Sequence, residues 1–148
     1  MLKSISSTKK AYIAGFLDGD GSIYVRAKPN LTYKFGFQIA PYIVLFQSNK
    51  DRENFEKLCK LIGYGYLRER KDGILEYVIN RIDDIKDFLE AISPYSILKR
   101  DQIRLMMKII KFKKKIKNAN DFKSLLKLVD DYRNLNYSKK RKKRTLTP

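Results

Sequence analysis

The pattern of apolar and polar positions predicts strands in two stretches of the first third of the chain. Residues 22–28 and 33–46 alternate with a period of two, which is typical of half-buried strands. Pro29 and Asn30 between them form a turn signal, so the two stretches are predicted to make one long hairpin. Pro41 inside the second stretch predicts a bulge or an edge position.

The two faces of this predicted hairpin differ in chemistry. Its core-facing positions are Ile23, Val25, Ala27, Phe35, Phe37, Ile39, Ile43 and Leu45. The opposite face carries Tyr24, Arg26, Lys28, Lys34, Gln38, Tyr42 and Val44. No acidic residue occurs between Ser22 and Asn49, although a merely solvated face would carry both signs of charge. The hairpin is therefore predicted to be basic on its open face.

Helical spacing of apolar residues alternates with a second hairpin in the rest of the chain. Helices are predicted over residues 7–18, 51–62, 84–92, 99–117 and 120–135, and a hairpin over residues 64–70 and 75–81 around Asp72 and Gly73. Ser7 or Thr8 is the expected cap of the first helix, Gly19 and Gly21 its expected end, and Asn120 the expected cap of the last helix. This order predicts an α+β fold with an antiparallel sheet.

Composition bounds the class of protein. With 148 residues and no Gly/Ser linker, the chain is predicted to form one domain over residues 1–137, followed by a basic tail over 138–148. Its 33 basic and 16 acidic residues give a net charge of +17, which favours a polyanionic partner. A membrane surface is the competing partner, but no apolar run is long enough to span a bilayer and no signal-peptide pattern opens the chain. We therefore expect no membrane partner and no secretion.

The absence of histidine removes several kinds of chemistry. Without His, and with Cys59 as the single cysteine, histidine general bases, Ser-His-Asp triads, cysteine-based zinc sites and internal disulfides are excluded. A nuclease built from this chain must use carboxylates and hard cations. The abundance of Lys, Ile, Asn and Tyr fits an AT-rich coding source, so an organelle (chloroplast or mitochondrion) or a prokaryotic cytoplasm is the expected location.

The end of the first predicted helix carries an unusual acid. Asp20 lies where the helix dipole is negative, which costs a few tenths to about 1 kcal/mol unless a cation offsets it. Small residues recur every fourth position at Ala11, Gly15 and Gly19, which predicts a smooth strip for close approach of another backbone. A glycine inside a helix costs about 1 kcal/mol against alanine, so Gly15 indicates a packing reason.

Residues 13–21 resemble the signature of the LAGLIDADG homing endonucleases. The identical positions are Ala14, Gly15, Asp18, Asp20 and Gly21. Residues 28–30, 33–35, 63–70 and 135–142 are similar to the DNA-binding hairpins and the phosphate-holding segment of the single-motif, dimeric members of algal-organelle intron type. The resemblance thus covers nearly the whole chain.

The resemblance implies a fold and an assembly. The fold is a saddle-shaped antiparallel sheet with helices packed on one face and the motif helix at a homodimer interface. The interface residues carried over to this sequence are Ala11, Gly15, Asp18 and Gly19. Two copies of Asp20 would then approach each other, and bound cations would remove the repulsion between them.

The resemblance also implies catalytic residues. Asp20 would bind Mg²⁺ with help from the Gly19 carbonyl, with Mn²⁺ as a substitute and Ca²⁺ binding without cleavage. Gln47 matches the solvent-organising residue and Lys99 the active-site lysine. One position departs from the pattern, because the expected arginine falls on Asp51. Lys50 or Arg52 would have to supply that charge.

A set of polar and basic residues is predicted to contact double-stranded DNA. A two-stranded ribbon fits the major groove, where Arg pairs with guanine and Gln or Asn with adenine. The predicted contacts are Tyr24, Arg26, Lys28, Asn30, Thr32, Tyr33, Lys34, Gln38, Tyr42, Val44, Arg68, Arg70, Arg81, Ser138, Lys139, Lys140, Arg141 and Lys142. A nuclear localisation signal or simple counter-charge is the alternative for the terminal basic run.

Together these features predict a metal-dependent, site-specific homing endonuclease, a phosphodiester hydrolase that breaks both strands of a long pseudo-palindromic DNA target in intron mobility. The alternatives are a non-cleaving DNA-binding protein or an RNA-splicing maturase of the same fold. A basic structural protein of ribosomal type would explain the charge but not the small-residue strip or Asp20. The target sequence does not follow from the chain, because readout depends on which side chains reach which bases.

Overall fold

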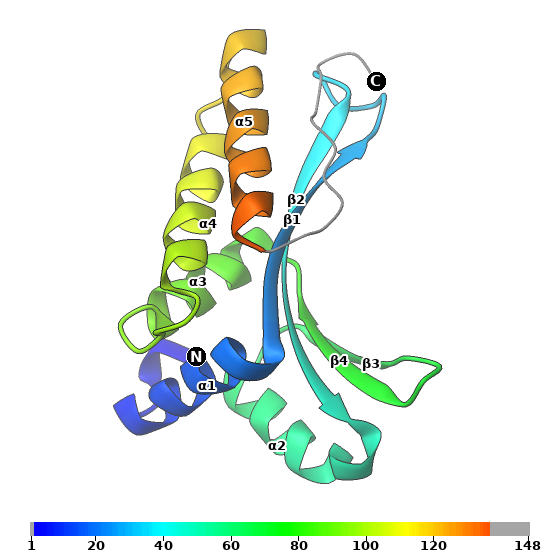
Figure 1. Ribbon diagram of the computed structural model, residues 1–148, viewed down its shortest axis with the longest axis vertical. Helices are drawn as coiled ribbons and strands as arrows, with labels where there is room; N and C mark the ends of the chain where they lie inside the picture. The colour runs from blue at the N-terminus through cyan, green and yellow to red at the C-terminus, as the bar shows by residue number, and fades with distance from the viewer. Residues whose placement is uncertain (1, 137–148) are drawn as a thin grey trace. The chain divides into compact units, whose positions relative to one another are not determined.

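The computed structural model describes residues 2–136, and its order of elements confirms the α+β fold (Figure 1). The elements are η1 (Leu2–Ser4), α1 (Ser7–Asp20), β1 (Gly21–Pro29), β2 (Phe37–Ser48), η2 (Asn49–Asp51), α2 (Arg52–Ile62), β3 (Tyr66–Glu69), β4 (Ile74–Ile79), α3 (Ile82–Ile92), α4 (Arg100–Lys113) and α5 (Ala119–Leu135). The strands form one sheet in the order β1-β2-β4-β3. The β2–β4 and β3–β4 pairs are antiparallel.

The chain packs as two compact units. Unit 1 comprises Met1–Ile23 and Tyr42–Arg100, and unit 2 comprises Tyr24–Pro41 and the chain from Asp101 onward. Strands β1 and β2 each contribute to both units. The domain boundary expected at residue 137 lies at the edge of the described residues, so it stays a prediction.

The first helix of unit 1 differs from the prediction at both ends. Its cap is Ser6, whose hydroxyl oxygen accepts a hydrogen bond from the Lys9 N–H. At the other end the helix continues through Gly19 and Asp20, and it stops at Gly21, whose N–H donates to the Leu17 carbonyl. Gly21 is needed there because an added Cβ would lie 2.6 Å from Leu17 Cδ1 and 2.8 Å from its carbonyl oxygen.

The core of unit 1 lies between its helices and the strands. α1 buries Ile13 and Leu17 and lies against α3, which buries Phe88 and Leu89. The second hairpin forms as predicted, with Gly73 at a positive φ in its turn. Its strand β4 pairs with β2 from Ile43 opposite Ile79 to Ser48 opposite Ile74. The helix that ends at Gly63 is also confirmed, since Gly63 takes the left-handed conformation that glycine favours.

One expectation for β2 is wrong. The strand begins at Phe37 rather than residue 33, because residues 31–36 form the turns that close the hairpin. Pro41 agrees with the predicted edge position: β2 as a whole lies between β1 and β4, but residue 41 lies before the part of β2 that pairs with β4. The proline is tolerated because the pairing with β4 begins only at Ile43, so no bond to β4 requires an N–H at position 41.

Unit 2 packs the outer part of the first hairpin against α4 and α5. Val25, Ala27, Phe37 and Ile39 are buried, as the alternation predicts. The Phe122 ring of α5 stacks on Phe35, with 5.1 Å between ring centroids, and on Phe37, with 6.3 Å. This stack anchors the hairpin to α5.

The cap of α5 also differs from the prediction. Asn118, not Asn120, caps the helix, and its side-chain oxygen accepts a hydrogen bond from the Asp121 N–H. The sequence offered two asparagines within three residues, and the capping geometry selects the first.

Candidate active site and nucleic-acid interface

The last turn of α1 presents Asp20 to solvent, and the small-residue strip lies along the same helix. Ala11, Gly15 and Gly19 are exposed, and none of residues 2–136 lies within 4 Å of a Cβ added at either glycine. The neighbouring Tyr12 is 64 % exposed. The described part of one copy of the chain therefore leaves this strip uncovered, although each glycine lowers the stability of the isolated helix.

Asp18 ties the last turn of α1 to the segment that follows α3. Its carboxylate accepts hydrogen bonds from Ser96 Oγ at 2.5 Å, Ile97 N at 2.7 Å and Leu98 N at 2.9 Å. Partial burial pushes the pKa of Asp18 up, but these donors outweigh it and hold the pKa below its usual value. The Asp18 carboxylate is therefore used within the chain, and the interface role predicted for this residue stays a prediction.

Lys99 reaches the same end of α1. Its Nζ donates to the backbone carbonyl of Asp18 at 3.2 Å, two residues before Asp20. The negative end of the helix dipole favours a cation here. The structure thus brings Lys99 and the helix end that carries Asp20 together, from positions far apart in the sequence.

Gln47 lies at the far end of β2, where the side-chain oxygen accepts a hydrogen bond from the Ser48 N–H at 2.8 Å. In an antiparallel hairpin the end of the second strand lies beside the start of the first. Since Asp20 directly precedes β1, the hairpin places Gln47 and Asp20 at the same end of the β1–β2 pair.

The residues around position 51 differ in their pairing. Arg52 is bonded to Glu56 at 3.4 Å and to Glu69. Asp51 accepts a hydrogen bond from the Asn54 amide. Lys50 is exposed, and its ammonium has no carboxylate within ion-pair distance among residues 2–136. Of the two residues that could supply the expected basic charge, Lys50 is the one without an acidic partner in residues 2–136.

Residues 2–136 offer one carboxylate to a hard divalent cation at the end of α1, so its other oxygen ligands must come from outside the chain: water, a substrate phosphate or a second copy. Within residues 2–136 no group of three or more acidic or cysteine side chains is close enough to hold a metal ion. Asp20 supplies one exposed carboxylate, an oxygen ligand that suits Mg²⁺ or Ca²⁺. Cys59 is no alternative, because burial raises the pKa of its thiol to about 12 and keeps it protonated.

The open face of the first hairpin keeps most of its predicted residues accessible. Arg26, Thr32, Tyr33 and Lys34 are exposed, and Tyr24, Lys28, Asn30, Gln38 and Tyr42 are partly exposed. Asn30 shapes the turn, since its side-chain oxygen accepts hydrogen bonds from the Thr32 N–H and hydroxyl. The DNA contact predicted for Val44 is wrong, because Val44 is only 1 % exposed and faces Val78 across the sheet.

The three arginines of the second hairpin region are exposed but paired. Arg68 pairs with Glu76, Arg70 with Asp72, and Arg81 lies 4.0 Å from Asp84. The tail residues Ser138, Lys139, Lys140, Arg141 and Lys142 lie outside the described residues. Their predicted DNA contacts stay predictions.

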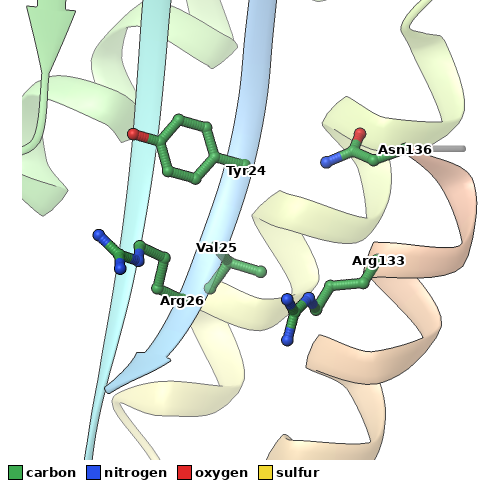
Figure 2. Close-up of a pocket in the computed structure, with 5 residues that line it drawn as sticks. All are labelled: Tyr24, Val25, Arg26, Arg133 and Asn136. Carbon is green, nitrogen blue, oxygen red and sulfur yellow. The ribbon is translucent and has the colours of Figure 1, made fainter. Parts of the chain in front are cut away.

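Two features escaped the sequence analysis. Ile97 and Leu98 are 75 % and 76 % exposed beside α1, and the only signal for them is an apolar pair outside any periodic segment. The second feature is a pocket in unit 2 formed by Arg133 with residues of β1 (Figure 2). The sequence gives no separate signal for Arg133, because it lies on the polar side of a helix that is recognised by its buried apolar residues.

Comparison with known proteins identifies the family. The model of the LAGLIDADG endonuclease family matches residues 13–106. The DNA endonuclease I-CreI of Chlamydomonas reinhardtii is 38 % identical over 132 residues, which cover 88 % of this chain and 80 % of that protein. The chain belongs to the LAGLIDADG endonuclease family. A second LAGLIDADG relative, the DNA endonuclease I-CvuI of Chlorella vulgaris, is 33 % identical over 76 % of this chain and 68 % of its own length.

Solved LAGLIDADG structures share the fold. The homing endonuclease I-CvuI in complex with the I-CreI target, with Mg present and the DNA not cleaved, superposes with a TM-score of 0.84 at 30 % identity, covering 91 % of this chain and 86 % of that one. The same protein with its own target in the presence of Ca gives the same values. The archaeal I-Vdi141I in complex with DNA, at 24 % identity and a TM-score of 0.80, supports the fold alone. No helix in residues 2–136 combines the length and apolar character needed to cross a lipid bilayer.

Proposed function

We propose that this LAGLIDADG endonuclease acts as a homodimer that makes a site-specific double-strand break in a long pseudo-palindromic DNA target, with Mg²⁺ as its metal, in intron homing. The observation that carries the proposal is the pairing of one exposed acid, Asp20, with an uncovered strip of small residues on the same helix. One motif per chain supplies one acid, so two copies are needed to cut two strands.

The dimer forms when the strips of two α1 helices press together. Gly15 and Gly19 allow close backbone approach, and the exposed Ile97 and Leu98 add apolar area beside the helix. Two-fold symmetry makes such an interface self-complementary. The same packing brings the two Asp20 carboxylates together, and they become compatible when cations lie between them.

Each protomer contributes side chains to one scissile phosphate. Asp20, with the Gly19 carbonyl, binds the metal, whose role when bound is to activate water and stabilise the leaving oxygen. Lys99, held at the end of α1 by the Asp18 carbonyl, offsets negative charge that develops on the phosphate. Gln47 orders solvent from the end of β2.

Lys50 supplies the further positive charge of the site. Arg52 is held by two glutamates, whereas the Lys50 ammonium is exposed at the end of the strand that carries Gln47. Mn²⁺ is expected to replace Mg²⁺, and Ca²⁺ to support binding without cleavage, because its coordination is larger and less regular.

Digestion of a randomised duplex library tests the proposal. With Mg²⁺, sequenced ends should define one long, pseudo-palindromic site cut on both strands. Asp20→Asn should abolish cleavage and keep specific binding, and Asp131→Asn, which removes an exposed acid from α5, should change neither. Cleavage by Asp20→Asn at the wild-type rate would overturn the metal assignment, and a strictly monomeric active protein would overturn the dimer.

One observation favours a second candidate function. Asp51 occupies the place of an expected basic residue, which would favour binding over cleavage. A non-cleaving DNA-binding protein or a maturase would retain duplex DNA or intron RNA without any nicked product. An organelle (chloroplast or mitochondrion) or a prokaryotic cytoplasm stays the expected location, and the relatives named above come from algae.

A further inference from the structure

Unit 2 contains a basic pocket of about 300 Å³ at the edge of β1 (Figure 2). It is lined by Tyr24, Val25 and Arg26 of β1 and by Arg133 and Asn136 at the end of α5. β1 is an edge strand of the sheet, so the pocket opens along backbone that no further strand covers. Figure 2 shows Arg133 and Asn136 directed from α5 toward β1.

The side chain of Arg133 is the unusual part of this pocket. Its Nη1 atom is buried and donates no hydrogen bond. Among the residues that the structure describes, no carboxylate lies within ion-pair distance of its guanidinium. A buried charged donor without a hydrogen-bond partner destabilises the folded protein, so native proteins usually satisfy such groups.

A purely structural role for Arg133 explains less. Arg133 lies in the last turn of α5, where the helix dipole favours a cation. A capping role would direct its N–H groups to the last carbonyls of the helix. The Leu135 carbonyl instead accepts a hydrogen bond from Gln102 Nε2 at 3.3 Å, and Arg133 makes no hydrogen bond to any carbonyl in residues 2–136.

The chemistry of the lining selects an anion with several acceptor oxygens. Two guanidinium groups, an amide and a phenol line the pocket, and among residues 2–136 no acid lines it. Arginine binds phosphate through two parallel N–H bonds. Tyr24 and Arg26 also belong to the open face proposed to read DNA, so a duplex on that face would bring its backbone to the edge of β1.

We propose that this pocket receives one backbone phosphate of the bound duplex, with Arg133 as its main ligand and Asn136 as a second donor. The inference rests on the proposed DNA-binding function and adds a site that reads no base. A phosphate contact at the edge of β1 fixes the register of the duplex along the strand, so that Arg26 meets one defined base pair.

Removal of the Arg133 charge tests this site. Arg133→Gln is compared with Arg104→Gln, which removes the same charge from an exposed position on α4. Fluorescence anisotropy with a labelled random-sequence duplex, over a series of salt concentrations, gives the slope of log K against log[salt]. The slope should fall in magnitude by about 0.9 in Arg133→Gln, the value for one lost phosphate contact, and should not change in Arg104→Gln.

A neutral phosphate analogue locates the contact. Single methylphosphonate substitutions are placed along the specific target duplex that the library digestion identifies. They should weaken wild-type binding at one phosphate per half-site, and Arg133→Gln should show no further loss at that phosphate. Thermal unfolding of both variants without DNA establishes that they are folded, and Arg133→Lys should recover part of the slope.

The outcomes distinguish a failure of the phosphate site from a failure of the proposed function. If wild-type protein binds duplex but Arg133→Gln keeps the wild-type slope, or matches Arg104→Gln, the phosphate site is wrong and the proposed function stands. If every methylphosphonate affects wild type and variant equally, the site is also wrong. If the wild-type protein binds no duplex at all, the proposed function falls, and this inference falls with it.

Discussion

The two units of the chain treat charge differently. Unit 1 holds 14 basic and 12 acidic residues, a net +2, whereas the described part of unit 2 holds 13 basic and 4 acidic residues, a net +9. The remaining six basic residues follow residue 136. The excess that points to a polyanion is therefore concentrated outside the unit that carries Asp20.

The use of arginine differs in the same way. In unit 1, Arg52, Arg68 and Arg70 each pair with an acid of the same unit. In unit 2, Arg26 and Lys34 have no carboxylate within ion-pair distance among residues 2–136, and Lys34 instead lies over the Phe35 ring at 5.5 Å. The three arginines Arg52, Arg68 and Arg70 of unit 1 are thus held by acids, whereas Arg26 of unit 2 has no carboxylate partner within residues 2–136 and can meet a ligand.

The largest effect is expected where unit 1 meets a second copy. Gly15→Leu adds a side chain to open space on one chain, so the protomer should fold normally. At a close helix interface the added volume costs about 1–3 kcal/mol, which raises the dimer dissociation constant about 10- to 100-fold. Sedimentation velocity and a cleavage assay measure both. Asn120→Leu, on an exposed position of α5, is the control and should leave mass and activity unchanged.

Gly15→Ala tests the same position through the free energy of unfolding. Alanine is favoured over glycine in a helix by about 1 kcal/mol, so this variant should be more stable if Gly15 is uncovered. If Gly15→Ala is more stable and Gly15→Leu remains fully dimeric, this strip is not the interface.

An intermediate effect is expected from replacing one unpaired and one paired arginine, each by glutamine. Arg26→Gln should weaken DNA binding about tenfold, since a base contact is worth about 1–3 kcal/mol, and should leave thermal stability unchanged. Arg52→Gln breaks the contacts to Glu56 and Glu69 and should lower stability slightly without changing DNA affinity. Anisotropy and thermal unfolding on both variants measure the difference. Equal effects on affinity would erase the distinction between the units.

The smallest effect concerns acid. The pKa of Asp18 is lowered in the folded chain, so its stabilisation is present above the ordinary aspartate pKa and is lost as pH falls through the lowered folded value. Urea unfolding over this acid range should show a loss that Asp18→Asn lacks, because that variant lacks the titrating group. Asp131→Asn, in unit 2, should retain the wild-type acid profile. If Asp18→Asn loses as much unfolding free energy at acid pH as the wild type does, Asp18 is not the source of the pH dependence.

Local signals predicted most of the fold, because they act over a few residues. Gly63 and Asp72 with Gly73 marked a helix end and a turn that the structure confirms. The caps at Ser6 and Asn118 were missed by one or two residues, since several capping residues compete at each helix start. Periodicity placed Val44 on the open face but did not reveal that Val44 is buried in the sheet, where Val78, far away in sequence, lies opposite it in β4.

The features that the sequence did not predict depend on contacts between residues far apart in the chain. The bonds from Asp18 to Ser96, Ile97 and Leu98 join residues about eighty positions apart, and no local pattern encodes them. The placement of Lys99 beside α1 follows from those bonds. The motif itself indicated Asp20, and the exposed carboxylate at the helix end agrees with that expectation.

Gly21 determines where this protein can diversify. A side chain at this junction would collide with Leu17, so the backbone next to Asp20 leaves little room for substitution. Arg26, five residues along the same strand, has no carboxylate partner among residues 2–136 and carries no comparable constraint. Under the proposed function, the residue that meets the DNA bases can therefore be exchanged without disturbing the backbone that holds the acid, and target preference and cutting chemistry can be altered separately.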